Sequence, residues 1–437
     1  MEITELKNKV CSAIDEYQEK IIKLAKDVAQ HPELGYKEQV TSQLVKRFYE
    51  EIDLTYEDGL AITGVKAKLK DNGNGPNVAI LGELDAVLCP DSSCADPATG
   101  AAHSCGHNLQ LGAMLGAALG LKLSNISQQL TGNVTFMAVP AEEYVEIAYR
   151  LKLREAGKLH YLGGKQELIY RGAFDDIDMA MMIHSAKEAP EPTVQIGESS
   201  NGFIGKTIQY IGQEAHAAEA PDQGINALNA AMLGLMGIHA LRETFRDGDI
   251  VRVHPIITKG GDLVNSVPAD VRVETYVRAK TMQAIDATHS KVDRALRAGG
   301  DAVGAQTVIQ SLPGYLPLNC SAAFNQLFVE NSVQFLARES ITNSGHFSAS
   351  TDMGDVSHLM PVIHPYIGGT VGALHTRDFC AVNYYAACVL PAKIMAMTVI
   401  DLLAGNAQQA KAILDSYQPL MTKAEYIEKL DSYFAQS

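Results

Sequence analysis

The sequence is short of positive charge. Its 437 residues contain 36 Lys and Arg against 51 Asp and Glu, which gives a formal net charge of −15. An excess of negative charge on this scale argues against nucleic acid or an anionic membrane as a partner. A small anionic substrate is still allowed, because the local charge inside a cleft can oppose the charge of the whole molecule.

Paired cysteine motifs and a long apolar run are also missing. The seven cysteines are odd in number and show no C-x-x-C framework, which indicates a reducing compartment. The N-terminus has no basic segment followed by an apolar core, so no signal peptide is expected. The most apolar stretch, 109–123, is too short and too rich in glycine to span a bilayer. We therefore expect a soluble, cytoplasmic protein that neither enters nor binds a membrane.

Three nearly all-apolar segments alternate with helical patterns in the first half of the chain. These segments, 78–82, 133–139 and 178–183, are typical of buried parallel strands, so we predict an α/β domain with helices on both faces of a mostly parallel sheet. A chain of this length also exceeds one ordinary domain.

The pattern changes near residue 195. A strand at 203–211, a helix at 225–245, two strands near 251–258 and 271–277, a helix at 282–298 and a last strand at 307–312 follow in order. This order predicts a ferredoxin-like α+β unit inserted into the larger domain. We predict a first catalytic segment at 1–196, the inserted domain at 197–313 and a second catalytic segment at 314–437.

Side chains that bind metals follow the predicted core strands. Cys105 and His107 lie in a tight turn before an apolar helix, Glu142 and Glu143 follow strand 133–139, and His184 ends strand 178–183. Ligands of parallel sheets bind at the carboxyl ends of the strands, where these residues would meet. With His375 from the last third, Cys105, His107, Glu143 and His184 form a plausible set of zinc or manganese ligands.

Glu142 is not in this set of predicted ligands, and its carboxylate could instead take part in catalysis. Glu142 is next to a predicted ligand and could take a proton from a metal-bound water. Any one of these histidines alone would more often be a structural side chain, and Cys105 alone an inert buried thiol. The set stands out because several independent elements end in such residues at one edge of one predicted sheet.

Five motifs are spread along the chain: His-Ser-Cys-Gly-His-Asn at 103–108, Pro-Ala-Glu-Glu at 140–143, Gly-Gln-Glu-Ala-His at 212–216, Gly-Gly-Asp-Leu-Val-Asn-Ser-Val-Pro at 260–268 and Leu-His-Thr at 374–376. Together they resemble the dinuclear metallopeptidase and amidohydrolase family, which includes aminoacylase, p-aminobenzoyl-glutamate hydrolase and the indoleacetyl-amino-acid hydrolases. The resemblance covers almost the whole chain. The Cys-Gly-His form is similar to the amidohydrolase branch.

This resemblance implies roles for the residues. Cys105, His107, Glu143, His184 and His375 would bind two divalent ions, manganese or zinc, with Cys105 at or near the bridging position. Glu142 would be the general base and then the acid. The inserted domain would act as a lid and as the homodimer interface. His216 from that domain would polarise the scissile carbonyl, often in the partner subunit's site, and Asn265 and Arg278 would be candidates to bind the substrate carboxylate.

Two positions depart from the pattern of many relatives. Their His-x-Asp pair is replaced by Glu83-Leu-Asp85, so Asp85 is expected to support a ligand rather than bind metal. The usual Asp after Cys-Gly-His is Asn108, which would orient the site. The sequence leaves open whether Glu83 or His103 touches the metals.

The sequence and the resemblance predict a class of reaction but not one substrate. The expected activity is hydrolysis of the amide bond of a small molecule: an N-acyl-amino acid, a p-aminobenzoyl-glutamate-like compound or a dipeptide. Two alternatives remain: a hydrolase with Cys105 as its nucleophile, and a catalytically silent, metal-stabilised binding protein.

Overall fold

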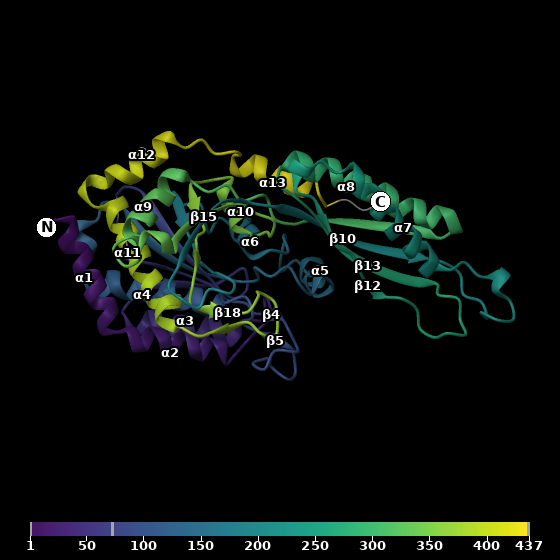
Figure 1. Ribbon diagram of the computed structural model, residues 1–437, viewed down its shortest axis with the longest axis horizontal. Helices are drawn as coiled ribbons and strands as arrows, with labels where there is room; N and C mark the ends of the chain where they lie inside the picture. The colour runs from purple at the N-terminus through teal and green to yellow at the C-terminus, as the bar shows by residue number, and fades with distance from the viewer. Residues whose placement is uncertain (1, 71–73, 435–437) are drawn as a thin grey trace. The chain divides into compact units, whose positions relative to one another are not determined.

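The computed structural model describes residues 2–70 and 74–434 (Figure 1). The chain divides into two compact units. Unit 1 comprises Met1–Ser199, Asn319–Gly345 and Asp355–Leu420, and unit 2 comprises Ser200–Leu318, His346–Gly354 and Met421–Ser437. The sequence-based division instead placed 346–354 and 421–437 with the larger domain.

Unit 1 is built on a six-stranded sheet whose centre is parallel. The strand order is β1-β2-β6-β3-β7-β16, with β6, β3, β7 and β16 parallel and β1 and β2 antiparallel. β3 and β6 are buried along their whole length because nearly every side chain is apolar. The mostly parallel sheet predicted from the sequence is therefore confirmed. The strands are β1 (Tyr56–Leu60), β2 (Gly64–Lys68), β3 (Asn77–Glu83), β6 (Asn133–Val139), β7 (Met179–Met181) and β16 (Val362–Ile363).

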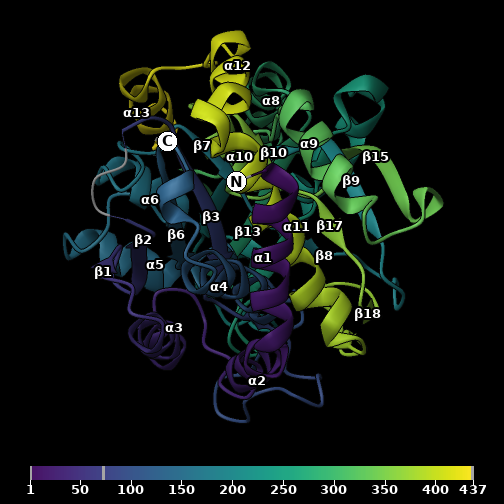
Figure 2. The same ribbon diagram turned by 90° about the vertical axis from the view of Figure 1, so that its left-hand side faces the viewer.

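A helical layer packs on this sheet around α4 (His107–Leu123), which contacts β3. α1 (Ile3–Glu16), α2 (Gln18–Ala29) and α11 (Leu390–Leu403) pack against α4 (Figure 2). Glycines in α4 allow this close packing: a Cβ at Gly120 would lie 2.5 Å from Ile14. The other helices of unit 1 are α3 (Gln39–Glu51), α5 (Ile147–Glu155), α6 (Gly164–Tyr170), α9 (Ala322–Ser332) and α12 (Gln408–Ser416).

One segment, Tyr385–Leu403, is long and apolar enough to cross a membrane, but 94% of its most apolar window is buried inside the protein. It contains a π-helical turn, Tyr385–Val389, followed by α11. Burial of this kind is typical of the core helix of a globular unit.

A second sheet in unit 1 carries His184. Its strand order is β15-β9-β17-β8, where β8 is His184–Ser185, β17 is Tyr366–Ile367, β9 is Val194–Ser200 and β15 is Ile341–Phe347. β8 and β17 run parallel, and His184 pairs with Tyr366. Two short pairs complete the unit: β4 (Val87–Leu88) with β5 (Ala101–Ala102), and β18 (Thr370–Val371) with β19 (Cys380–Ala381).

Unit 2 has the ferredoxin-like order of elements that the sequence predicts. Its sheet runs β11-β13-β10-β14, with β12 also paired to β13, and α7 and α8 pack side by side on it. Alternate residues of β10 and β13 enter a core that includes Ile208, Tyr210 and Val273. The elements are β10 (Gly202–Ile211), α7 (Ala227–Leu241), β11 (Arg252–Val253), β12 (Ile256–Lys259), β13 (Asp270–Ala279), α8 (Met282–Val303), β14 (Gln306–Pro313) and α13 (Lys423–Asp431); α10 is Met353–Ser357.

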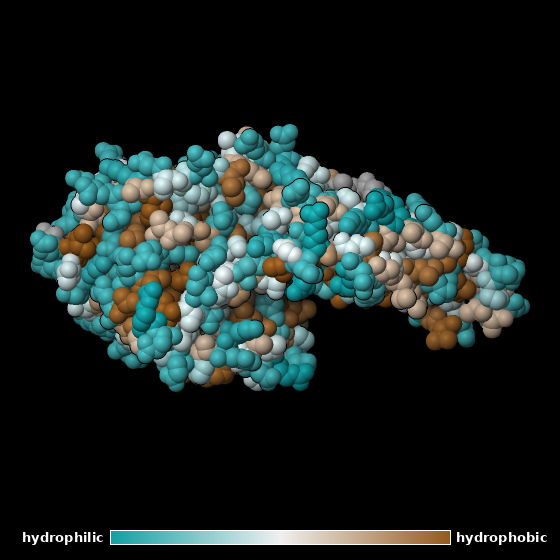
Figure 3. Space-filling view, turned by 45° about the horizontal axis from the view of Figure 1, so that its top comes forward, coloured by the Kyte–Doolittle hydropathy of each residue, from teal (hydrophilic) through white to brown (hydrophobic). Residues whose placement is uncertain are grey.

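Unit 2 exposes large apolar side chains on α7 and on the β12–β13 connection. Met236 is 66% exposed and Val264 is 95% exposed. Figure 3 shows hydrophobic residues gathered on the surface of this unit.

Candidate metal centre

The turn that begins α4 presents Cys105 and His107 on either side of Gly106. Gly106 adopts φ 81°, in the left-handed region that favours glycine. A Cβ at this position would lie 2.2 Å from the Ser185 hydroxyl oxygen, so the turn also packs too closely against β8 for any side chain. Both constraints require a glycine between the two ligand-type residues.

Three imidazoles converge around the thiol of Cys105. Cys105 Sγ lies 3.3 Å from Nε2 of His184 and 3.2 Å from Nε2 of His375. Nε2 of His375 is also 2.9 Å from Oε1 of Glu143. Cys105, His107 and His184 form one group whose ligand atoms lie within 4.8 Å of one another, and Cys105, Glu143 and His375 form a second. The two groups share Cys105.

Backbone oxygens set which nitrogen of each histidine faces the thiol. Nδ1 of His107 is 2.8 Å from the carbonyl oxygen of Asp85, and Nδ1 of His184 is 3.0 Å from the carbonyl oxygen of Ser185. A carbonyl can only accept, so Nδ1 carries a proton in both rings, and Nε2 is the nitrogen that could bind a cation. Nε2 of His107 is buried and lies 3.1 Å from Oε2 of Glu83. These features fit residues built to bind a cation.

Glu142 and Glu143 follow β6 in a turn held from three sides. Ala141 adopts φ 53°, and its N–H donates to Glu38 at 2.8 Å. The N–H of Glu143 donates to Asp85 Oδ2 at 2.8 Å, and the guanidinium of Arg150 donates to the Glu143 carbonyl. Because buried side chains fix this backbone, the two carboxylates have a defined direction.

Charges within the cluster shift the pKa values of its members. Burial alone would raise the pKa of Glu143, but His375, His107 and a hydrogen bond with Cys105 together outweigh burial and lower it to about 2. The Glu143 carboxylate in turn raises the pKa of His375 to about 12. Burial and Glu143 raise the pKa of the Cys105 thiol, and the surrounding imidazoles outweigh them and lower it to about 6. A divalent ion would have to displace the imidazolium proton on binding.

Glu83, which the sequence left open, lies next to the cluster. Its Oε2 is 3.1 Å from Nε2 of His107, and Glu83, His107 and Glu142 form a third group of possible ligands. Lys165 lies 2.6 Å from Oε1 of Glu83, and Gln110 donates to Oε2 at 2.9 Å. Both partners hold the carboxylate in place beside His107.

His103 and Asn108 lie outside the groups of possible ligands. Asn108 donates to the carbonyl oxygen of Ala25 in α2, and so fixes the first turn of α4. His103 is outside all three groups of possible ligands, and its burial lowers its pKa to about 3. The structure thus gives Asn108 an orienting contact, and His103 interacts with the cluster through the charge of His107, which also lowers the pKa of His103.

Three predicted site residues belong to unit 2. His216 forms a bridge with Ser266, and the N–H of Ala217 donates to the carbonyl oxygen of Asn265, so His216 and Asn265 lie on neighbouring segments. Arg278 pairs with Phe203, whereas Ile211, five residues before His216, pairs with Asp270. Eight residues of strand separate these pairs, roughly 26 Å at 3.3 Å per residue. Within one chain, Arg278 is therefore not brought to His216 and Asn265.

Sequence reasoning missed four side chains at or near the cluster. Glu38, Arg150 and Lys165 come from helical or turn segments, where a charged residue is normally solvated. The fourth is His364, whose ring centre lies 5.6 Å from that of His184. Its position directly after β16, at the same sheet edge as His184, was the signal that could have identified it.

Known proteins share this fold, and several are similar to this chain in sequence. Residues 199–302 match the family described as the peptidase dimerisation domain. The chain is 30% identical to the Xaa-Arg dipeptidase of Mus musculus, over 97% of this chain and 96% of that one. It is 23% identical to the N-acetylcysteine deacetylase of Bacillus subtilis, over 69% of this chain and 76% of that one. A Bacillus subtilis structure, described as a dinuclear metal binding peptidase from the M20 family, superposes with a TM-score of 0.66 at 20% identity, over 89% of this chain and 99% of that chain.

Proposed function

The chain belongs to the M20 family of metal-dependent peptidases and amidohydrolases, and on that premise we propose that it hydrolyses the peptide bond of dipeptides. The similarity to the mouse Xaa-Arg dipeptidase runs through nearly the whole of both chains, which favours dipeptides, with a C-terminal arginine as the first substrate to test. N-acyl-amino acids and p-aminobenzoyl-glutamate are the next candidates.

One observation carries the proposal: the Nε2 atoms of His184 and His375 lie 3.3 and 3.2 Å from Cys105 Sγ, and Oε1 of Glu143 lies 2.9 Å from the same Nε2 of His375. We propose that Cys105 is shared by two divalent ions. His107 and His184 would complete one site, and Glu143 and His375 the other. A mixed set of thiolate, imidazole and carboxylate accepts manganese or zinc.

The ions, when bound, would lower the pKa of a water and polarise the amide carbonyl. Glu142 takes a proton from the attacking water as its oxygen adds to the carbonyl carbon. As the carbon–nitrogen bond breaks, Glu142 returns the proton to the leaving nitrogen, so the carboxylate is regenerated. Asp85 keeps Nδ1 of His107 protonated, and thereby keeps Nε2 facing the ions.

Unit 2 would supply the remaining contacts. We propose that His216 donates a hydrogen bond to the carbonyl oxygen, that Asn265 and Arg278 bind the substrate carboxylate, and that two chains form a homodimer through unit 2. The match of residues 199–302 to a peptidase dimerisation domain supports this assembly. The separation of Arg278 from His216 within one chain supports a site completed by a partner subunit.

A reducing, cytoplasmic location is also part of the proposal. Its support is the seven cysteines, all of which are free.

The experiment is a hydrolysis screen on protein stripped of metal and reloaded with Mn²⁺ or Zn²⁺. Ala-Arg, Ala-Lys and Ala-Glu test the dipeptide class, and N-acetyl-arginine and p-aminobenzoyl-glutamate test the others. We expect cleavage of at least one substrate only after metal is added. No cleavage of any of them by the loaded protein would contradict the proposal.

The same samples test a cysteine nucleophile. The lowered pKa of Cys105 would suit a thiolate nucleophile. A thiol hydrolase would keep its activity after the chelator and metal are removed, whereas the proposed enzyme recovers only when metal is returned.

A further inference from the structure

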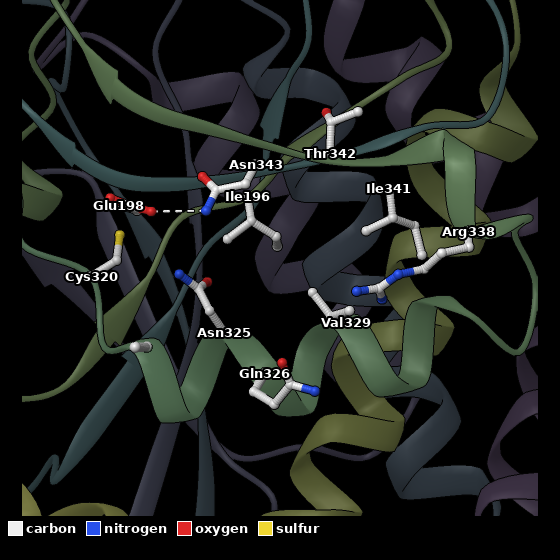
Figure 4. Close-up of a pocket in the computed structure, with 11 residues that line it drawn as sticks. Ile196, Glu198, Cys320, Asn325, Gln326, Val329, Arg338, Ile341, Thr342 and Asn343 are labelled. Carbon is white, nitrogen blue, oxygen red and sulfur yellow. Dashed lines mark hydrogen bonds between the residues drawn. The ribbon is translucent and has the colours of Figure 1, made fainter.

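A cavity in unit 1 lies between α9 and the strands β9 and β15 (Figure 4). It encloses about 290 Å³, at the small end of the range for ligand sites. None of its lining residues belongs to the metal-ligand groups around Cys105. A molecule bound here would therefore not occupy the centre described above.

The cavity carries opposite charges at its two ends. Figure 4 shows Glu198 at one end and Arg338 at the other, with the guanidinium directed into the cavity. Glu198 accepts a hydrogen bond from Asn343 at 2.8 Å, which orients its carboxylate. Within the described ranges 2–70 and 74–434, the Arg338 side chain has no hydrogen-bond or ion-pair partner, so it is available to bind a carboxylate bidentately.

A buried acceptor without a partner also belongs to this cavity. Asn325 is 7% exposed, and its Nδ2 donates to the carbonyl oxygen of Gly197 at 3.1 Å. Its Oδ1 is buried and has no hydrogen-bond partner among the described residues. Leaving such an acceptor unpaired is unfavourable, and a ligand that donates a hydrogen bond would relieve it.

Aliphatic side chains line part of the cavity wall. Ile196 lies between Glu198 and Arg338, and Val329 and Ile341 lie beside Arg338 (Figure 4). They favour an uncharged spacer in the ligand and disfavour a further charge there.

We propose that this cavity binds a small zwitterion whose ammonium and carboxylate groups are separated by an uncharged spacer, such as a dipeptide or an ω-amino acid. Arg338 binds the carboxylate, Glu198 and Asn325 Oδ1 accept hydrogen bonds from the ammonium, and the aliphatic wall contacts the spacer. An ordinary α-amino acid is disfavoured because its two charges are adjacent. The proposal does not depend on the hydrolytic function.

The test is ligand binding to the metal-loaded protein, measured by ligand-observed NMR with 5-aminopentanoate and glycylglycine as probes. We expect saturable binding of at least one probe. Pentanoate and pentylamine, which each carry one charge, should bind at least tenfold more weakly. Tighter binding of glycylglycine would identify a dipeptide as the natural class, and tighter binding of 5-aminopentanoate an ω-amino acid; the spectra also reveal any glycine released by cleavage.

Variants locate the binding. Arg338→Gln should weaken it at least tenfold, and Ala322→Phe, at an exposed position in the cavity lining, should abolish it by filling the space. Arg47→Gln, the same change at an exposed arginine of α3, should leave it unchanged. The proposal is overturned if neither probe binds, if pentanoate or pentylamine binds as well as the probes, or if both cavity variants bind like the unaltered protein while keeping its circular dichroism spectrum.

Discussion

Cys105 is the residue on which the candidate centre depends. Its thiol is within 3.3 Å of the two imidazoles of His184 and His375, and these come from chain positions far from it and from each other. A thiolate can bridge two cations, so one side chain would tie both proposed metal sites together.

At Gly106 we predict that alanine is not tolerated. Gly106→Ala would place a Cβ at φ 81° and 2.2 Å from the Ser185 hydroxyl oxygen, so the turn must shift. We expect a loss of roughly 1–3 kcal/mol of stability and weaker metal binding, measured by thermal denaturation and metal titration. Gly248→Ala is the control, because nothing lies within 4 Å of a Cβ there. Equal behaviour of the two variants would refute the account of this turn.

We predict that replacing Glu142 impairs catalysis without impairing metal binding. Glu142→Ala should keep both metals but lose about 10²–10⁴-fold in kcat, since only proton transfer is removed. Elemental analysis and the hydrolysis assay check this, with Glu155→Ala, an exposed glutamate of α5, as the control. Normal turnover in Glu142→Ala would remove it as the base.

Glu38 should make stability depend on pH. Burial, and then the charge of Asp85, raises its pKa from 4.5 to about 7. The folded chain therefore holds this proton more tightly than the unfolded chain. The contribution to the free energy of unfolding is fully present below pH 4.5 and is lost as the pH rises through about 7.

Glu38→Gln removes this titration. Between pH 5 and pH 8, thermal denaturation should shift in favour of the variant relative to the unaltered protein, by an amount on the order of 1–3 kcal/mol. Parallel pH curves for the two proteins would contradict the raised pKa.

The individual ligand-type residues could be predicted from the sequence because most of them lie in a recognisable turn or directly after an apolar strand. The structure brings Cys105, His184, Glu143 and His375 together, and their roles as ligands stay predictions. The charged supports could not be predicted. Arg150 and Lys165 have the sequence context of solvated residues, and only the fold shows that both are buried.

Among the helices, strands and turns, the turn between β6 and α5 positions the carboxylates of Glu142 and Glu143. The buried guanidinium of Arg150 donates to the carbonyl oxygens of Ala141 and Leu162, at 3.3 and 2.8 Å, and to that of Glu143. α5 thus acts as a brace for the two carboxylates that follow β6.

We predict that Arg150→Met weakens this brace. The carbonyl oxygens lose their donor, which costs about 1–3 kcal/mol for each group left unpaired, and Glu143 should bind metal more weakly. Thermal denaturation and metal titration measure both effects. Arg154→Met, one turn along the same helix, is the control; equal metal affinity for the two variants would contradict the bracing role.

The core strands could be predicted from their apolar runs, but β1 and β2 could not. β1 carries Glu57 and Asp58 and is largely exposed, so it lacks the buried pattern that identified β3 and β6. The sheet that carries His184 was missed because β8 and β17 have only two residues each. Pairings between such short, distant segments leave no periodic signal.

The whole molecule is proposed to act as a dimer. On α7 of unit 2, Met232, Leu233 and Met236 are 54%, 44% and 66% exposed. Apolar side chains one helical turn apart form a stripe suited to a second copy.

Light scattering should therefore find a dimer. Met236→Glu would place a charge in the interface and should raise the dimer dissociation constant at least tenfold, since a buried unpaired charge is costly. Lys411→Glu, on the exposed surface of unit 1, should not. A monomer at every concentration of the unaltered protein would refute the dimer.

The central claim is that one thiol serves two metal sites, and metal stoichiometry tests it most directly. After loading with Mn²⁺ or Zn²⁺, we predict two ions per chain. His184→Ala and His375→Ala should each lose one ion, and Cys105→Ala should lose both. A single ion in the unaltered protein, or two ions retained in Cys105→Ala, would contradict the account.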